Sequence, residues 1–466
     1  MDIKNINKLI YKKLRIKYEK LILLISFFLV YFYYNKKLNF YHSQIKKYYS
    51  KIQLDLNLSF IKNLKNEINL GLYSYSLKNG GRARLTSTLI NYFYKINLFK
   101  IFLFTKIGKE DNEYFIPEDV KRIVIENNIN KIISKYKIDI LLYNLYNGNE
   151  INKLNNKRKL KVIYYQHASL FYFLYSNYTS FLSLYEAYKN SKYIVSLIPL
   201  ESNYIFKYWG INSILMTNFI TYKYNSVIPS NLMSNTILMI GRGKNKFKRF
   251  NLGISAMEYI IKKNSLCEMK IISNLNGTID LQNIIHNLNL EHQIKFIGYS
   301  LIPEIYFKNS SLHIFPTISE SFGLVLSETK IYGIPNILIG LDYVQISRGG
   351  TIILYDDSPE SLAKESIKII ENVNYRKNLG RNARNNMKKF DNKLLFYNWI
   401  KIILSIYNGD DFYNKIKIQE NLVNETQLIK SLNNQIKLLK KRNTHFCEIS
   451  IKDFQNFNNL YKFKIE

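Results

Sequence analysis

Short apolar stretches alternate with helical stretches along most of the chain, and this alternation constrains its fold more than any other feature. A first series of expected strands begins near Glu67, and a second begins at Thr236. The expected strands span residues 68–76, 100–104, 138–143, 159–165, 193–198, 213–216, 236–241, 269–273, 294–298 and 311–315. Strands that are separated by helices form parallel sheets with helices on both faces. The sequence therefore predicts an α/β protein with two doubly wound, Rossmann-like domains.

A polar connection at 222–235, which contains Pro229, separates the two series of strands. The boundaries expected from this and other composition changes are 1–66, 67–222, 223–390, 391–410 and 411–466. In the last part, apolar residues recur at heptad spacing between Ile418 and Leu439, with a charged break at Glu425. This helical tail is expected either to lie on the rest of the chain or to support weak self-association.

The net charge of the chain is +32, from 67 Lys and Arg against 35 Asp and Glu. The basic residues are spread along the whole chain, which favours a general compositional bias over a nucleic-acid site; attraction to acidic lipid is a secondary expectation. No zinc-ligand spacing or nucleic-acid motif is present, so we expect no nucleic-acid partner. The two cysteines, Cys267 and Cys447, are too few for a disulfide framework and favour a reducing compartment.

The N-terminal part combines a basic stretch, an apolar stretch and a polar stalk. Residues 1–20 are basic, and residues 21–34 carry no charge and end in aromatic residues. The apolar stretch is shorter than the ~20 residues of a spanning helix, and no small-residue cleavage site follows it. We expect an uncleaved membrane anchor, spanning or interfacial, with a buried helix as the alternative. Residues 35–65 are expected to form a helical stalk.

The segment from Phe315 to Pro335 contains the most informative local pattern. An expected strand ends at Pro316, a polar turn follows, and a helix begins at Leu324. Strand, turn and helix in this order present backbone N–H groups to anions at the helix N-terminus, and Gly323 allows a ligand to approach the backbone closely. Glu320 and Glu328 flank this turn, and carboxylates accept hydrogen bonds from sugar hydroxyls. The alternative is an ordinary helix-start acid and a solvated surface glutamate.

The run from Glu320 to Glu328, with Phe322-Gly323 inside it and Gly333-Ile334-Pro335 behind it, resembles the E-x7-E signature of the retaining family 4 (group 1) glycosyltransferases. The resemblance covers residues 67–408. It implies the GT-B fold, in which two Rossmann-like domains face a cleft and the last helix crosses back to the first domain.

The resemblance also implies roles for residues of the second domain. Glu328 would bind the ribose hydroxyls of a nucleotide-sugar donor, and Glu320 would bind the hydroxyls of the transferred sugar. Arg242 and Lys248 resemble the family's Gly-Arg…Lys element and would hold the donor diphosphate, because fixed cations stabilise the charge of a departing nucleoside diphosphate. The backbone N–H groups near the helix start would add to this site, and the residues concerned are Phe322, Gly323 and Leu324.

Two further site elements are expected in the first domain. Gly80 and Gly81 follow the first strand, precede a helix expected from Leu85, and match the family's glycine-rich loop beside the donor phosphates and the acceptor. The nearby Arg82 and Arg84 either meet an anionic group or form a solvated helix start. His167 follows the strand at 159–165, where ligands of doubly wound sheets bind, and by resemblance would contact the donor sugar.

Several residues depart from the family pattern. Arg249 stands where the family has Gly, and it is expected either to contact phosphate or to occupy a surface position. Thr329-Lys330 replaces small residues, and Gly349-Gly350 only partly fits the family's glycine-rich turn.

Together these features predict a retaining hexosyltransferase that uses a UDP- or GDP-sugar and an acceptor hydroxyl, in glycolipid or glycan synthesis. We expect no metal and no other cofactor, a glycan or lipid-linked acceptor, and attachment to a membrane surface through residues 21–34. The charge of the N-terminal flank nominally places the domains outside the cytosol, but related anchored enzymes work on the cytosolic face, and we expect a cytosolic location. A catalytically inactive GT-B membrane scaffold and a sugar-nucleotide epimerase of the same fold are the alternatives.

Overall fold

The computed structural model describes residues 67–409, apart from short gaps. The gaps are residues 79, 97, 111–112, 127–128, 146–147, 156–159, 170–171, 173–177, 210, 223, 243–245, 274–277, 299, 301–302 and 391. The predicted anchor at 21–34, the stalk and the heptad pattern at 418–439 lie outside the described residues. Within the described part, no helix is both long and apolar enough to cross a membrane.

The first domain is built on a parallel sheet of seven described strands in the order β3-β2-β1-β4-β5-β6-β7. These strands are β1 (Ile68–Ser74), β2 (Phe99–Thr105), β3 (Lys121–Val124), β4 (Ile140–Tyr143), β5 (Lys161–Tyr165), β6 (Tyr193–Ser196) and β7 (Ile214–Leu215). Its helices are α3 (Gly81–Lys95), α4 (Ile129–Lys135), α5 (Gly148–Asn155), α7 (Tyr178–Lys189) and α8 (Pro199–Trp209). Leu72 of β1 lies beside Leu103 and Leu142 of the neighbouring strands, and all three are buried. Strands that are buried on both faces read as apolar runs, which is why the sequence identified every described strand of this sheet except the partly exposed β3.

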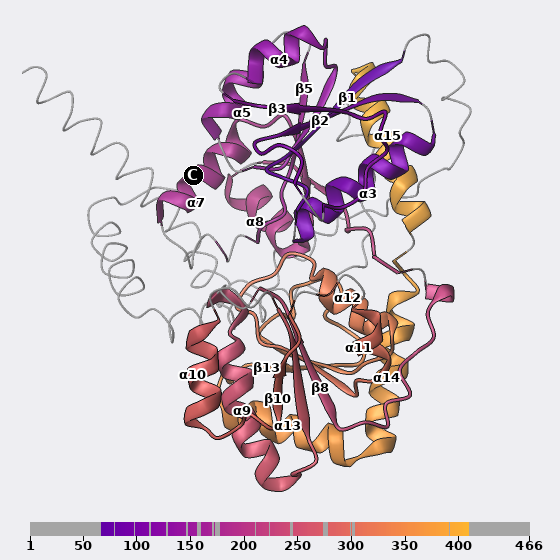
Figure 1. Ribbon diagram of the computed structural model, residues 1–466. Coiled ribbons are helices and arrows are strands. Elements are labelled where there is room, and N and C mark those ends of the chain that lie inside the picture. Colours follow the sequence, from indigo (N-terminus) through magenta and orange to yellow (C-terminus); the bar gives the residue numbers. More distant parts are fainter. Residues whose placement is uncertain are drawn as a thin grey trace, which may run out of the picture.

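The second domain is built on a parallel sheet of six described strands in the order β10-β9-β8-β11-β12-β13. These strands are β8 (Thr236–Ile240), β9 (Glu268–Ile272), β10 (Ile294–Phe296), β11 (Leu312–Phe315), β12 (Asn336–Ile339) and β13 (Thr351–Leu354). Its helices are α9 (Phe250–Lys263), α10 (Ile279–Asn287), α11 (Glu304–Lys308), α12 (Leu324–Ile331), α13 (Pro359–Glu371) and α14 (Val373–Met387), with short 3-10 turns at η2 (Tyr224–Ser226) and η3 (Lys246–Lys248). Two parallel sheets with helices on both faces confirm the predicted α/β class with two Rossmann-like domains (Figure 1).

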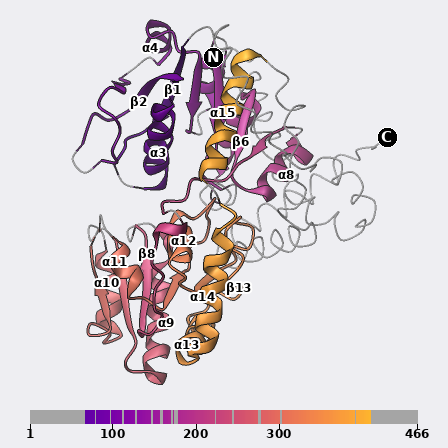
Figure 2. The ribbon, with the colours of Figure 1, turned by 90° about the vertical axis from the view of Figure 1, so that its right-hand side faces the viewer.

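The last described helix, α15 (Asn392–Asn408), follows α14 of the second domain but lies against the first domain (Figures 1 and 2). Its Trp399 is fully buried and meets the ring of Tyr165 edge-on, with ring centroids 4.9 Å apart. The Lys161 ammonium donates to the carbonyls of Ile406 and Tyr407 at 2.6 and 2.7 Å. A cation at the C-terminal carbonyls of a helix is stabilising, so Lys161 fixes the end of α15 to β5.

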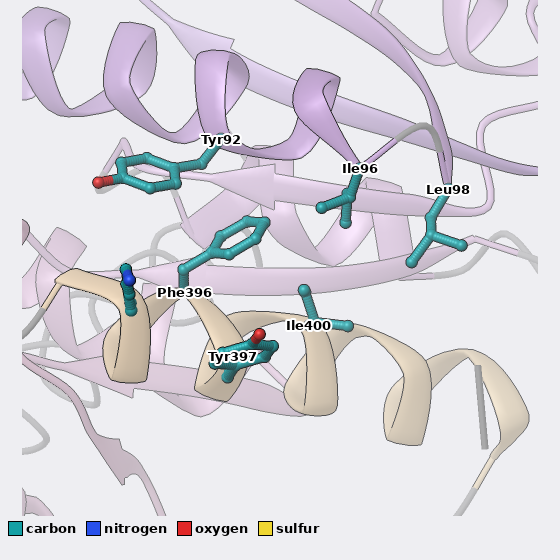
Figure 3. Close-up of a pocket in the computed structure, with 7 residues that line it drawn as sticks. Tyr92, Ile96, Leu98, Phe396, Tyr397 and Ile400 are labelled. Carbon is teal, nitrogen blue, oxygen red and sulfur yellow. The ribbon is translucent and has the colours of Figure 1, made fainter. Parts of the chain in front are cut away.

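An apolar groove of about 470 Å³ separates the C-terminal half of α3 from the N-terminal half of α15. Figure 3 shows side chains from both helices facing each other across it. Its lining consists of Tyr92, Ile96, Leu98, Lys393, Phe396, Tyr397 and Ile400. None of these residues belongs to the predicted site, which uses the opposite, N-terminal end of α3.

Candidate active site

The predicted site residues follow the carboxyl ends of strands in both sheets. His167 follows β5 of the first domain, and Lys248 and Glu320 follow β8 and β11 of the second. Loops of the two domains meet here, because the Ser321 hydroxyl donates to the His167 carbonyl at 2.7 Å. The Gln345 amide makes a second connection by donating to the Leu197 carbonyl at 2.6 Å. The predicted residues from the two domains therefore lie at one interdomain boundary, with α12 at the top of the second domain in Figure 1.

Helix α12 begins at this boundary with a backbone conformation that favours glycine. Gly323 is its N-cap, with φ of 80°, and no side chain caps the helix among the described residues. Phe322 is fully buried and packs edge-on against Phe390, and this contact fixes the turn that precedes α12. An uncapped helix N-terminus carries unpaired N–H groups and a partial positive charge, so this end of α12 is suited to an anion.

The glycine-rich loop of the first domain lies directly against this helix start. Gly80 is the N-cap of α3 with φ of 93°, and the helix begins at Gly81 rather than at the expected Leu85. A Cβ atom at Gly81 would come within 3.3 Å of the Leu324 side chain. The first turns of α3 and α12 therefore converge, and Gly81 permits the close approach.

Lys248 and Glu320 form an ion pair beside this turn. The Lys248 ammonium is 2.8 Å from Glu320 Oε2, and each side chain is about one fifth exposed, at 20% and 21%. The same ammonium lies 5.2 Å from the centre of the Phe315 ring. Arg242, by contrast, is exposed after β8 and takes part in none of the hydrogen bonds or ion pairs found in the described part of the chain. The structure thus joins Lys248 to Glu320 and leaves Arg242 apart from them.

Glu328 is buried and contacts the first domain. Its side chain is 3% exposed, and Oε1 lies 2.6 Å from the Arg84 guanidinium. The Thr221 hydroxyl donates to the same oxygen at 2.7 Å. The alternative of a solvated surface glutamate is therefore wrong for Glu328, and the anionic group that Arg84 meets is this carboxylate.

Arg249 occupies a backbone conformation that explains why the family has glycine there. Its φ and ψ are 50° and 43°, in the left-handed region. Its guanidinium pairs with Asp357 at 3.1 Å, and the two side chains are only 14% and 8% exposed. The expectation of a surface position is therefore wrong, since the arginine belongs to a mostly buried ion pair.

His167 is partly buried, and its ring lies 4.0 Å from the Tyr165 ring, centroid to centroid. Burial and the neighbouring positive charge of Arg82 lower the pKa of His167 to about 3. The imidazole is therefore neutral at physiological pH, with one nitrogen that donates and one that accepts a hydrogen bond.

The low pKa of His167 gives a testable pH dependence. Between pH 6.5 and 3 the unfolded chain binds more protons, so the stability from neutral His167 is complete above about pH 6.5 and is lost as the pH falls toward 3. Between pH 7 and 5, the free energy of unfolding of the wild type should fall by up to about 2 kcal/mol more than that of His167→Gln. Urea denaturation at both pH values measures the difference, and equal losses would contradict the assignment. His313, whose pKa is lowered to about 4 by burial, is present in both proteins and cancels.

Several residues of the site were not anticipated from the sequence. Tyr343 accepts a hydrogen bond from the Glu320 backbone N–H at 3.2 Å, and Thr221 and Ser321 make the contacts given above. Thr221 and Tyr343 belong to no motif singled out above, and Ser321 lies inside the Glu320–Glu328 run, where the spacing gives no reason to expect a contact with the first domain. No group of three or more His, Cys, Asp or Glu side chains that could hold a metal ion is found in the described ranges.

Comparisons with known proteins show which proteins this chain resembles. Residues 223–386 match the family described as glycosyl transferases group 1. An uncharacterized glycosyltransferase of Methanocaldococcus jannaschii is 24% identical over 227 residues, which are 44% of this chain and 62% of the relative. The D-inositol 3-phosphate glycosyltransferase of Paenarthrobacter aurescens is 30% identical over 130 residues, which are 26% of this chain and 32% of the relative. The chain thus spans less than two thirds of the length of these relatives.

Solved structures with the same fold cover more of the chain. Sucrose-phosphate synthase of Thermosynechococcus elongatus has a TM-score of 0.64 at 14% identity, covering 74% of this chain and 100% of that one. The HepE protein of Anabaena has a TM-score of 0.60 at 14% identity, covering 73% and 100%. The family match and these structures confirm the predicted resemblance to group 1 glycosyltransferases and the GT-B fold.

Proposed function

We propose that the protein is a retaining glycosyltransferase that moves a hexose from a UDP- or GDP-sugar to an acceptor hydroxyl. The observation that carries this proposal is the position of the Lys248–Glu320 ion pair beside the uncapped start of α12, at the boundary with the first domain. A cation, a carboxylate and a helix N-terminus in one place suit a ligand that is part diphosphate and part sugar. The HepE protein, which shares the fold, was crystallised with UDP and glucose.

In the proposed complex the diphosphate lies at the start of α12. Lys248, the N–H groups at Phe322, Gly323 and Leu324, and Arg242 after rotation of its exposed side chain would stabilise its charge. Gly80 and Gly81 would leave room for it on the side of the first domain. Because these groups supply the positive charge that a departing diphosphate requires, we propose that the reaction needs no metal ion.

The sugar and ribose are assigned to the two glutamates. Glu320 would accept hydrogen bonds from the sugar hydroxyls, Glu328 from the ribose hydroxyls, and neutral His167 would contact the sugar. We propose front-face attack, in which the departing phosphate takes the proton of the acceptor hydroxyl. Glu320 then acts by binding, and its ion pair with Lys248 suits that role. Trapping of a covalent glycosyl–Glu320 adduct would contradict this mechanism.

The acceptor and the location are proposed from the sequence of the N-terminal part. Residues 21–34 would attach the protein to a membrane, with the two domains in the cytosol, and the acceptor would be a glycan or a lipid-linked molecule. If deletion of residues 1–40 left activity on a membrane-bound acceptor unchanged, the lipid-linked acceptor would be abandoned.

A donor screen tests the proposed function. The protein is incubated with UDP- and GDP-hexoses in EDTA, and nucleotide release and thermal shift are measured beside Glu320→Gln and Arg242→Ala. We expect release from one donor in the wild type and its loss in both variants. A thermal shift without release, with or without acceptor, would favour a catalytically inactive scaffold, and no response to any donor would contradict a nucleotide-sugar ligand.

A further inference from the structure

One ion pair in the site connects the two domains. Arg84 lies in the first turn of α3 in the first domain, and Glu328 lies in α12 of the second. Their side chains are 2.6 Å apart and are 25% and 3% exposed. Thr221, in the connection between the domains, donates to the same carboxylate at 2.7 Å. Two groups from outside the second sheet therefore hold one buried glutamate.

Both contacts are made to a single oxygen of the carboxylate, Oε1. Burial of a charged group is costly unless the group is paired and hydrogen-bonded, and Arg84 supplies the charge partner. A guanidinium is also planar and rigid, so the contact restricts the direction of the carboxylate. Arg84 and Thr221 thus fix Glu328 through Oε1 and leave Oε2 outside these two contacts.

We propose that Arg84 is a positioning residue for the nucleotide donor, acting through Glu328. It holds Oε1 so that Oε2 meets the ribose hydroxyls of the donor. This inference rests on the proposed function, in which Glu328 is the ribose-binding residue. It adds a determinant of ribose recognition from the first domain, although the nucleotide is expected to lie mainly on the second.

Ribose recognition separates this role from a purely structural one. A structural ion pair between the domains would support binding of a ribonucleotide and of its 2′-deoxy analogue equally. A positioning role acts more strongly on the ribonucleotide, because the 2′-deoxy analogue retains only one of the two hydroxyls that the carboxylate binds.

The experiment is calorimetric titration of the full chain with UDP and 2′-deoxy-UDP, or with GDP and 2′-deoxy-GDP if the donor screen identifies guanosine. We expect the wild type to bind the ribonucleotide about tenfold more tightly than its deoxy analogue. Arg84→Ala should weaken ribonucleotide binding about tenfold and deoxynucleotide binding about threefold, because the deoxy analogue keeps one of the two hydroxyl contacts. The matched control is Lys95→Ala, which removes an exposed cation from the other end of the same helix and should leave both affinities unchanged.

Two further variants make the outcome decisive. Arg84→Lys keeps the charge without the planar fork, and it should restore part of the discrimination. The double variant Arg84→Ala/Glu328→Gln should show the same ratio of ribonucleotide to deoxynucleotide affinity as Glu328→Gln alone, because both residues act through one contact. Equal weakening of both nucleotides in Arg84→Ala would overturn the inference, as would unchanged discrimination in Arg84→Lys if the alanine variant does not fold. Failure of the wild type to bind any nucleotide would instead overturn the proposed function.

Discussion

Replacement of Lys248 by alanine is expected to lower kcat for nucleotide release by about 10²–10³-fold at saturating donor. This is the usual loss when one preorganised group that stabilises developing charge is removed from an active site. The ammonium lies beside the helix start to which the diphosphate is assigned, 2.8 Å from Glu320 and 5.2 Å from the Phe315 ring centre. Because only 20% of the Lys248 side chain is exposed, its charge is less screened than that of a surface lysine.

A second explanation of a Lys248 effect is that the lysine only neutralises Glu320. The double variant Lys248→Ala/Glu320→Gln distinguishes the two explanations. If Lys248 acts on the leaving group, the double variant should be slower than Glu320→Gln alone, whereas equal rates would mean that the lysine serves only the glutamate.

The matched control for charge is Lys262→Ala. Lys262 is on the neighbouring helix α9, is 64% exposed, and pairs with Glu258 at 2.7 Å. Exposed ion pairs of this type contribute little, so kcat should change less than about twofold. A loss below threefold for Lys248→Ala, with donor binding retained, would remove Lys248 from the mechanism.

The sequence was sufficient for the fold class because the central strands are buried runs of apolar residues. It did not predict three of the described strands: β12 and β13, which follow Pro335, and the edge strand β3. Incomplete burial explains β3 and β13 but not β12, which is fully buried. Strand β3, Lys121–Val124, has two charged residues followed by two apolar ones, lies at the edge of the first sheet and was not expected. The start of α3 was placed four residues late, because Gly80 and Gly81 read as a turn although Gly81 is already helical.

The local part of the candidate site was similarly accessible from the sequence, whereas its long-range contacts were not. Spacing placed Glu320, Gly323 and Glu328 around one helix start. It contains no information on Thr221 and Glu328, which are 107 residues apart, or on Gln345 and Leu197, which are 148 apart. Such contacts form only when the two domains pack together. In the sequence, each of these side chains is indistinguishable from any other polar residue.

Lys330 shows how a departure from the family pattern acquires a physical explanation. Its side chain is fully buried in α12, and burial lowers its pKa well below the ordinary value. The amino group donates to the carbonyls of Ile346 and Arg348. Lys330 therefore fixes the loop at 341–350. In this loop, Tyr343 accepts a hydrogen bond from the Glu320 backbone, and Gln345 donates one to the first domain.

The same loop ends at Gly350, and Gly350→Ala is expected to have the largest effect on stability. Gly350 has φ of 64°, and an added Cβ would lie 2.2 Å from the Leu379 carbonyl oxygen and 2.3 Å from the Ala383 backbone nitrogen. Both atoms belong to the backbone of α14, which cannot move aside as a flexible side chain can. Left-handed strain of roughly 1–2 kcal/mol and overpacking of roughly 1–3 kcal/mol together predict a loss of about 3 kcal/mol in the free energy of unfolding.

Gly409→Ala separates the two contributions, because Gly409 has φ of 77° but nothing within 4 Å of an added Cβ. The Gly409→Ala variant should lose only the stability that corresponds to left-handed strain, about 1 kcal/mol. Thermal unfolding should therefore show Tm falling roughly 6–12 °C for Gly350→Ala and roughly 2–4 °C for Gly409→Ala. Similar Tm shifts in the two variants would mean that α14 moves to accommodate the added methyl group, so that overpacking contributes little. Because the displaced loop also carries Tyr343 and Gln345, Gly350→Ala should weaken nucleotide binding even at temperatures where the protein remains folded, whereas Gly409→Ala should not.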